Sequence, residues 1–389
     1  MAGTNGKGST TLMIAKVLNT CGYRAGRYSS PHLHSYCERF EIDDRAVTPG
    51  QLLACLDTVL AAAHKLPAED FPTEFEVLTA AAFLLFKDQQ VDIAVMETGM
   101  GGIYDATTAA DPLLSVITSI DYDHTAYLGN TLGEIAANKA GIIKPGIPVV
   151  IGPMEPEARQ VITECALKLN SPILDCSATR MTPSGSGDLF GQYVDIQVGR
   201  HRMEKVWFSL AGNFQLDNLS CALTALNELE KMSFVIEDEY IKPALGKLHS
   251  KGRLEVLSEK PLIICDVGHN PQAAQALHNT LHTLLLDRSK VLLVGMVDDK
   301  DAVGVLKFLG PGSTNCVVTR PLGQRGSNWQ RLAGIWSELF PHIPVSVVED
   351  IEKAADLSLT RLRSDDYLLV TGSFYLIDKA RQYMLKTFR

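Results

Sequence analysis

A glycine-rich segment near the start of the chain, residues 3–10 with the sequence GTNGKGST, restricts the fold more than any other feature. It leads directly into residues 12–18, whose apolar spacing predicts a helix. Glycines let backbone N–H groups close around phosphate oxygens, the helix N-terminus adds partial positive charge, and Lys7 supplies a mobile cation. The segment is shorter at the front than the general P-loop and has Gly8 between the lysine and two hydroxyls that can reach magnesium or phosphate. We therefore predict a nucleoside-triphosphate site, rather than an ordinary glycine-rich turn, formed by Gly3, Thr4, Asn5, Gly6, Lys7, Gly8, Ser9 and Thr10.

Short runs rich in Val, Ile and Leu alternate with helical patterns along most of the chain. Continuous apolar runs are typical of parallel strands that helices cover on both faces. Thr48-Pro49 predicts a helix start, and Thr73–Glu76 and Thr131–Glu134 predict capping boxes. The fold class is therefore α/β with a mainly parallel sheet. The expected strands are 93–96, 114–118, 148–151, 262–265, 291–294, 316–319, 345–348 and 367–370.

One region interrupts this alternation. Residues 177–210 contain Gly and Ser with alternating segments at 193–198 and 205–209, which predicts a small antiparallel insertion. A helix is expected at about 213–231, followed by a linker at 243–253. We predict two domains: residues 1–248, with the phosphate loop, and a smaller α/β unit at 249–389.

Composition excludes several classes of protein. Forty-five acidic and 36 basic residues give a net charge of −9, which argues against a general nucleic-acid or anionic-membrane surface. No apolar run approaches the length of about 20 residues that crosses a bilayer, and no signal peptide is visible. Eight scattered cysteines form no C-x-x-C pair. We expect a reduced, soluble cytoplasmic protein with no nucleic-acid or membrane partner. Hydride transfer is disfavoured because no G-x-G-x-x-G follows a strand.

An ordered series of motifs resembles the Mur ligase superfamily, and within it the bifunctional bacterial dihydrofolate synthase/folylpolyglutamate synthase group. The match covers essentially the whole chain in the right order, although any single piece except GTNGKGS would be weak. The further motifs are YSSPHL at 28–33, ERF at 38–40, ETGMGG at 97–102, DAT at 105–107, DYDH at 121–124, KAGIIK at 139–144, Gly212-x-x-Gln215-x-x-Asn218, Arg253, DVGHNP at 266–271, DKD at 299–301 and GSFY at 372–375.

The resemblance implies a P-loop ligase domain followed by a smaller Rossmann-like domain, and an ATP- and Mg²⁺-dependent carboxylate–amine ligase. Such an enzyme adds L-glutamate to dihydropteroate, a reduced folate or both, through an acyl phosphate. A monomer is expected. Two alternatives stay open: a ligase of UDP-N-acetylmuramoyl peptides, although such relatives generally carry an additional N-terminal domain, and a P-loop nucleotide-binding protein without ligase activity.

The resemblance also assigns roles to residues outside the loop. It places Ser30, Glu97 and His124 around one magnesium ion, and Lys139, carbamylated by carbon dioxide, beside a second. Lys7, His124 and Lys139 are the expected catalytic residues. From sequence alone, Lys139 would be an ordinary solvated cation at a helix end. Lys144 is interpreted as surface charge.

Nucleotide and substrate contacts are likewise implied by the resemblance. Glu74 and Glu76 also suit an ordinary helix start, where acids are expected. Relatives usually have Arg-Leu where Ile103-Tyr104 stand, and Glu where Asn138 stands, which bears on substrate preference. The implied nucleotide contacts are Asn218, Arg253, Asp266 and His269, and the implied substrate contacts are Thr73, Glu74, Phe75, Glu76 and Asp105.

Only Met1 and Ala2 precede Gly3, whereas family members usually have several dozen residues there. A P-loop normally follows a buried strand that directs it at the phosphates. We therefore expect a shortened chain that lacks its first strand, with unpaired edges on neighbouring strands and an unanchored phosphate loop.

Overall fold

The computed structural model describes residues 1–286 and 288–388; residues 287 and 389, both in the predicted second domain, lie outside the described residues. The chain forms two compact units. The first comprises Met1–Ser186, Gln192–Ser209 and Phe214–Leu248, and the second Gly187–Gly191, Leu210–Asn213 and His249–Arg389. Two short segments of the predicted first domain, 187–191 and 210–213, thus group with the second unit.

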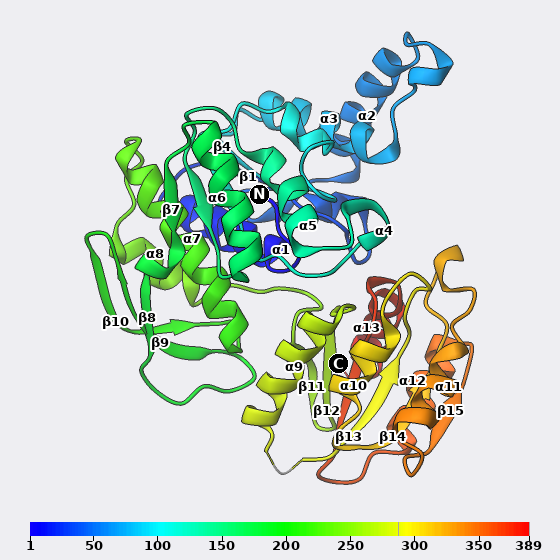
Figure 1. Cartoon of the computed structure of the whole chain (residues 1–389). Helices are drawn as coiled ribbons and strands as arrows, with labels where there is room; N and C mark the ends of the chain where they lie inside the picture. Colours follow the sequence, from blue (N-terminus) through cyan, green and yellow to red (C-terminus); the bar gives the residue numbers. More distant parts are fainter. Residues whose placement is uncertain (287, 389) are drawn as a thin grey trace. The chain divides into compact units, whose positions relative to one another are not determined.

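Besides the antiparallel sheet of the insertion, the first unit has two short sheets where the sequence predicts one mainly parallel sheet (Figure 1). In the first, β1 pairs in parallel with β4 and antiparallel with β2. The second is parallel throughout. In spatial order, the first sheet contains β3 (Arg45–Ala46), β2 (Phe40–Ile42), β1 (Ala25–Tyr28) and β4 (Ile93–Met96), and the second contains β5 (Ser115–Ile117), β6 (Val149–Ile151) and β7 (Ile173–Asp175).

The first two residues connect these sheets. Ala2 forms a parallel bridge with Ile117: its N–H donates to Val116 O at 2.9 Å, and its carbonyl accepts from Thr118 N at 3.0 Å. The Met1 amino group donates to Met96 O at 2.8 Å, at the end of β4. The expectation of an unanchored phosphate loop is therefore wrong, because backbone hydrogen bonds hold the residues before Gly3 between β4 and β5.

The helices of the first unit begin largely where capping chemistry predicts. Both predicted capping boxes are confirmed, at Thr73–Glu76 and Thr131–Glu134, and Thr48 forms a third with Gln51. These boxes satisfy N–H groups that have no partner within the helix. The helices up to the insertion are α1 (Lys7–Thr20), α2 (Pro49–Ala63), α3 (Glu74–Asp88), α4 (Thr125–Leu128), α5 (Leu132–Lys139) and α6 (Pro156–Lys168).

The predicted antiparallel insertion is confirmed as a three-stranded sheet of β8 (Arg180–Pro183), β9 (Gln192–Val198) and β10 (His201–Phe208). The predicted helix follows as α7 (Asn213–Lys231). The linker prediction is partly wrong, because Pro243 lies inside α8 (Asp238–Leu245). This short helix buries Ile241, Ala244 and Leu245, so its buried face extends past the proline.

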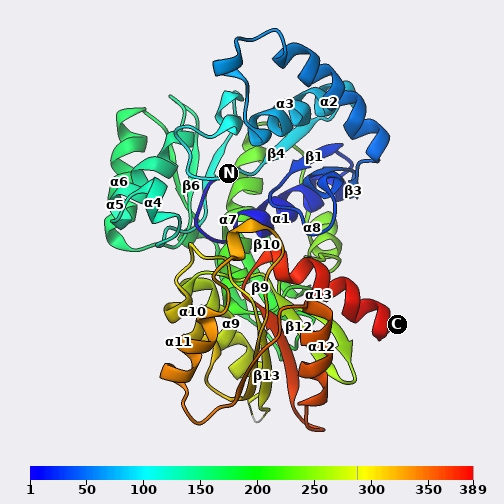
Figure 2. The same cartoon turned by 90° about the vertical axis from the view of Figure 1, so that its right-hand side faces the viewer.

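The second unit is built on one six-stranded sheet in the order β11-β12-β16-β13-β14-β15, parallel except for β11. Its central strands are entirely buried, as their apolar runs predict. Figure 2 shows α9, α10 and α11 on one face of this sheet and α12 and α13 on the other. The strands are β11 (Glu255–Glu259), β12 (Leu262–Asp266), β13 (Lys290–Val294), β14 (Ser313–Val318), β15 (Val345–Val347) and β16 (Tyr367–Thr371); the helices are α9 (Pro271–Leu284), α10 (Ala302–Leu309), α11 (Arg331–Leu339), α12 (Ile351–Thr360) and α13 (Phe374–Thr387). Within the described ranges, no helix combines the length and apolarity needed to span a membrane.

Candidate functional site

The glycine-rich loop is held in a shape that only glycine allows. Gly6 is the N-cap of α1, with φ of 85°, and a Cβ there would overlap Asn218 Oδ1. A Cβ at Gly3 would overlap the hydroxyl of Thr118. That hydroxyl donates to Asn5 O at 2.6 Å, and Ser119 O accepts from Thr4 N at 2.7 Å. The residues after β5 therefore fix the loop backbone, although the sequence analysis did not single them out.

Two lysines converge on one carbonyl of this loop. Lys7 Nζ donates to Gly3 O at 2.9 Å and to Thr4 O at 3.3 Å. Lys139 Nζ, which comes from the end of α5, donates to the same Gly3 O at 2.9 Å. The predicted phosphate lysine and the predicted modified lysine thus share a partner, and both lie at the carboxyl ends of the strands of the first unit.

Lys139 is not the solvated cation that its place at a helix end suggests, because only 4% of it is exposed. Burial, and secondarily the nearby charge of Lys7, lower the pKa of Lys139 to about 7, against the opposing effects of Asp123 and Asp105. A substantial fraction of this amine is therefore uncharged at neutral pH. A neutral amine is a nucleophile, whereas an ammonium group is not.

Glu97 and Ser30 lie together because their strands are parallel neighbours. Glu97 follows β4, Ser30 lies just beyond β1, and Tyr28 pairs with Met96 at the strand ends. The Ser30 N–H lies 3.4 Å from Glu97 Oε2, and a Cβ on Gly8 would lie 3.4 Å from the same oxygen. Glu97 is 4% exposed. A buried carboxylate therefore lies against the first turn of α1, with a hydroxyl-bearing residue beside it.

His124 occupies the N-cap of α4 with a left-handed backbone, φ 50°. Its Nε2 lies 3.9 Å from Asp123 Oδ1, and about a third of its side chain is exposed. Among residues 1–286 and 288–388, no three His, Cys, Asp or Glu side chains form a preassembled metal cluster. The structure thus brings Ser30 and Glu97 together, and the placement of His124 with them stays a prediction. Carboxylate, hydroxyl and imidazole donors nevertheless fit a hard divalent cation, since each offers an oxygen or nitrogen ligand.

Asp105 organises the loop that follows β4. Its Oδ2 accepts from Gly99 N at 2.8 Å and from Met100 N at 3.1 Å. Its Oδ1 accepts from the N–H and the hydroxyl of Thr107, at 3.0 and 2.6 Å. Four hydrogen bonds to this carboxylate therefore fix the conformation of residues 99–107.

Asn138 holds the same loop against α5. Its Oδ1 accepts from Gly102 N at 3.1 Å, and its carbonyl accepts from Ile103 N at 3.1 Å. A Cβ on Gly102 would lie 2.7 Å from the carbonyl of Lys139. The loop is thus packed directly onto the backbone that carries Lys139, and Tyr104 beside it is 92% exposed.

The segment 73–76 contributes mainly to structure. Thr73 and Glu76 form the capping box of α3, and Glu74 accepts from the Tyr36 hydroxyl at 3.0 Å. Phe75 is different, because a Cβ on Gly99 would lie 2.7 Å from its ring. Of these four predicted substrate contacts, Phe75 is the one that packs against the loop shaped by Asp105.

Asn218 and Lys144 both form hydrogen bonds with neighbouring residues. Asn218 Nδ2 donates to Gln215 Oε1 at 3.0 Å, which holds the amide oxygen of Asn218 toward Gly6. Lys144 is half-buried and its Nζ donates to Thr108 O at 2.9 Å. Its interpretation as surface charge stays a prediction.

In the second unit, three predicted residues gather where β12 and β16 end. Asp266 is 6% exposed and accepts from Leu254 N at 2.8 Å and Gly268 N at 2.7 Å. Burial raises the pKa of Asp266. The Arg253 guanidinium lies over the Phe374 ring at 5.4 Å, and the His269 ring centroid lies 6.2 Å from that of Phe374. These side chains form a charged and aromatic group at the ligand-binding edge of a parallel sheet.

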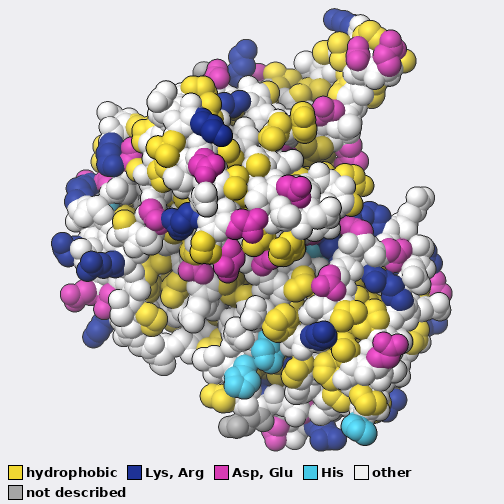
Figure 3. Space-filling view, in the orientation of Figure 1, with side chains coloured by type: hydrophobic (Ala, Val, Ile, Leu, Met, Phe, Trp, Pro, Cys, Tyr) yellow, Lys and Arg dark blue, Asp and Glu magenta, His cyan; other side chains and the backbone are white. Residues whose placement is uncertain are grey.

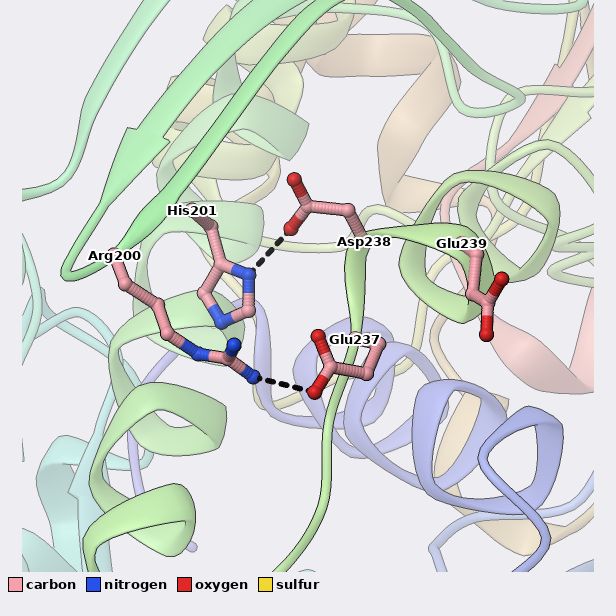
Figure 4. Close-up of a pocket in the computed structure, with 5 residues that line it drawn as sticks. All are labelled: Arg200, His201, Glu237, Asp238 and Glu239. Atoms are coloured by element: carbon pink, nitrogen blue, oxygen red, sulfur yellow. Dashed lines mark hydrogen bonds and ion pairs between the residues drawn. The ribbon is translucent and has the colours of Figure 1, made fainter.

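A separate pocket of about 520 Å³ contains none of the predicted residues (Figure 4). His201, only 3% exposed, lies between two acids: its Nδ1 is 2.5 Å from Asp238 and its Nε2 is 2.8 Å from Glu230. Arg200 pairs with Glu237 at 3.0 Å and with Glu230 at 2.8 Å. These ion pairs connect β10 with α7 and α8. We therefore interpret the pocket as structural.

Comparison with known proteins agrees with this geometry. Residues 1–226 match the Mur ligase middle domain, and residues 252–374 match the Mur ligase glutamate ligase domain. A dihydrofolate synthase/folylpolyglutamate synthase of Bacillus subtilis is 31% identical over 98% of this chain and 89% of its own length.

Two solved structures extend the comparison. The Mycobacterium tuberculosis folylpolyglutamate synthase, complexed with ADP and AMPPCP, has a TM-score of 0.90 at 30% identity, over 98% of this chain and 90% of that one. The bifunctional folylpolyglutamate synthase/dihydrofolate synthase of Yersinia pestis, complexed with AMPPNP and a manganese ion, has a TM-score of 0.83 at 31% identity, over 98% and 87%. The chain therefore belongs to the Mur ligase family, in its dihydrofolate synthase/folylpolyglutamate synthase group.

Proposed function

We propose that this chain is an ATP-dependent ligase that adds L-glutamate to dihydropteroate, to reduced folates, or to both. The observation that carries the proposal is the convergence of Lys7 and the buried Lys139 on Gly3 O, next to a phosphate loop built for nucleotide. The names and bound nucleotides of the relatives support the same activity.

The reaction needs two steps. A carboxylate oxygen of the pteroate or folate attacks the γ-phosphorus of ATP, which releases ADP and leaves an acyl phosphate. The uncharged amine of glutamate then attacks the acyl carbon, phosphate leaves, and one proton is released as the amide forms. Loop N–H groups and Lys7 stabilise the charge that develops on the phosphoryl oxygens. Catalysis of phosphoryl transfer consists mostly of such charge stabilisation and of positioning.

A divalent ion, which we propose to be Mg²⁺, would be held by Ser30, Glu97 and His124 and would neutralise phosphate charge when bound. The manganese in the Yersinia pestis relative supports a divalent metal. Lys139 would supply an anionic ligand to a second Mg²⁺ if its neutral amine adds to carbon dioxide, giving a carbamate and a proton. The lowered pKa of Lys139 favours this addition, because the nucleophile is the uncharged amine.

Other residues receive positioning or binding roles. We propose that Asn218, Arg253, Asp266 and His269 contact the nucleotide. Arg253 already stacks on Phe374, which orients its charge. Of the substrate set, Phe75 offers a flat apolar surface, whereas Asp105 acts by fixing the backbone of residues 99–102. Thr73, Glu74 and Glu76 support Phe75 from the start of α3.

The decisive experiment supplies ATP, Mg²⁺ and L-glutamate with dihydropteroate, tetrahydrofolate or a UDP-muramoyl acceptor, and detects each added glutamate by mass. We expect products with one or both pterin substrates and none with the UDP compound. Lys7→Ala should bind substrates but show no turnover, because the γ-phosphate loses its cation.

The alternatives have clear signatures. Phosphate release only with the UDP acceptor would favour a peptidoglycan-precursor ligase, and ATP binding without glutamate-dependent turnover would favour a non-ligase. Omitting divalent metal should abolish turnover, and adding Mg²⁺ should restore it. We further propose a cytoplasmic monomer, which size-exclusion chromatography with light scattering and cell fractionation would check.

A further inference from the structure

Two histidines lie one turn apart near the end of α9. His278 and His282 are four residues apart, so they project from the same face of the helix. Their ring centroids are 5.9 Å apart and their planes are inclined by 35°. His282 is exposed and His278 partly buried. Figure 3 shows histidine side chains gathered on the surface over α9.

This spacing matches the chemistry of metal chelation. Two imidazoles at positions i and i+4 of a helix form the paired zinc ligands of the H-E-x-x-H pattern. Zinc–nitrogen bonds of about 2.0 Å in tetrahedral geometry place two ligand nitrogens about 3.3 Å apart. Rings whose centroids are 5.9 Å apart reach that separation by side-chain rotation, without a change in the helix backbone.

We propose that His278 and His282 form a two-histidine site for a divalent transition-metal ion such as Zn²⁺, Ni²⁺ or Cu²⁺. Imidazole suits these ions, whereas Mg²⁺ prefers oxygen ligands. The site is distinct from the proposed catalytic metal position, because Ser30, Glu97 and His124 belong to the first unit and α9 to the second.

The surroundings set the strength of binding. In the described part of the chain, no third His, Cys, Asp or Glu joins such a pair, so water must complete the coordination. Lys290 acts electrostatically on His278 and opposes a bound cation. Two protein ligands and a nearby positive charge produce an exchangeable surface site rather than a structural zinc site with four protein ligands.

The position on the helix limits what the ion affects. α9 has 14 residues and is therefore about 20 Å long at 1.5 Å per residue. Its first turn follows Asp266 and His269, whereas the histidine pair occupies its last turns. Bound metal therefore stabilises the C-terminal end of α9 and leaves the predicted nucleotide contacts at its other end unchanged.

The test is an isothermal calorimetric titration of the full chain with Ni²⁺. The buffer contains excess Mg²⁺, which occupies oxygen-rich sites. We expect one Ni²⁺ per chain at this pair, and binding weakened about tenfold or more in the His278→Ala/His282→Ala variant. His342→Ala is the matched control, because it removes another exposed histidine of the same unit. Lys290→Met should tighten binding by removing the opposing charge.

Electron paramagnetic resonance with Cu²⁺ gives a second readout that does not depend on affinity. The wild-type spectrum should show two nitrogen ligands, and the double variant should lose that signature while circular dichroism confirms the fold. Ni²⁺ affinity within twofold of wild type in the double variant, or equal weakening by His342→Ala, would overturn the proposal.

Discussion

Lys139 lies in the first unit and Lys290 in the second. Both lysines are buried, but the groups that surround them differ. Removal from water is the main cause that lowers the pKa of each, to about 7 for Lys139 and about 8 for Lys290. Lys139 donates to a carbonyl of the phosphate loop and lies near the charges of Lys7, Asp123 and Asp105. Lys290 donates to Pro311 O. Burial therefore lowers the pKa of both amines, whereas the groups around them differ.

Topology explains the difference in neighbours. Lys139 ends α5 and packs under the loop that follows β4, at the carboxyl ends of parallel strands. Lys290 is the first residue of β13, at the amino end of its strand. Ligands of open α/β sheets bind at the carboxyl ends, where the loops are free to vary. Lys139 therefore lies at the end of a sheet where ligands bind, whereas Lys290 lies at the opposite end of its own sheet.

The sharpest way to break this comparison is to replace each lysine by methionine, which keeps the length and removes the amine. Lys139→Met should lower glutamate-dependent phosphate release by about 10³-fold or more, because we propose that the site uses this amine directly. Lys290→Met should stay within about threefold of wild type, since it touches no reacting group. Comparable losses in both variants would show that burial alone, and not position, explains the perturbed lysine.

A second prediction disturbs the loop and leaves both lysines in place. Gly6→Ala forces a Cβ onto Asn218 Oδ1 at φ 85°, so kcat/KM for ATP should fall by about 10²-fold as the loop shifts. Gly22→Ala is the matched control: φ is 92° there, but no atom lies within 4 Å of the added Cβ. The control should cost about 1–2 kcal/mol of stability without loss of turnover. Unchanged kinetics in Gly6→Ala would argue against a loop held by Asn218.

The third prediction concerns stability and pH. The pKa of Lys290 is about 8 in the folded chain and 10.5 when unfolded, so the unfolded state binds more protons between these values. Wild-type stability from this group therefore rises with pH from about 8 to 10.5 and is lowest below pH 8. Lys290→Met should stabilise the chain by up to about 3 kcal/mol at pH 7, at about 1.4 kcal/mol per pKa unit.

Urea denaturation at pH 7, 8.5 and 10 would measure this difference. The advantage of Lys290→Met should shrink at each step, because Lys290 of the folded wild type loses its proton above pH 8 while the unfolded chain keeps it up to about pH 10.5. For Lys139→Met, the stability difference from wild type should begin to shrink at a lower pH, near 7, because the pKa of Lys139 is about 7. A stability difference that is constant with pH would mean that packing, and not charge, distinguishes the variants.

The smallest expected effect comes from His201, a buried titratable group that has the acidic partners both lysines lack. His201→Ala should destabilise the chain by about 2 kcal/mol, because Asp238 and Glu230 lose their shared partner in a partly buried site. Turnover per folded molecule should not change. Glu239→Ala, at a pocket residue outside the pair of acids bound to His201, is the control for thermal unfolding.

Local chemistry made much of the fold predictable. The capping boxes at Thr73 and Thr131 need only residues three positions apart, and α7 follows from its apolar spacing. Pro243 misled the prediction for the same reason, since a local rule ends helices at proline while the buried face of α8 extends past it. Strands β1, β2, β3, β7, β8 and β11 were not assigned, because runs of two to five residues carry little periodic signal.

The sequence by itself determined the phosphate loop, the alternation of strands and helices, and the ordered motifs of a ligase family, because these depend on residue types at fixed short spacings. Only the tertiary structure decided that Lys139 is buried beside Lys7 and that the Asp105 carboxylate accepts hydrogen bonds from the loop after β4. It also decided that the Thr118 hydroxyl donates to Asn5 O, 113 positions away in the sequence. Burial, charge proximity and long-range hydrogen bonds are properties of packed neighbours, and packing joins residues that no local spacing relates.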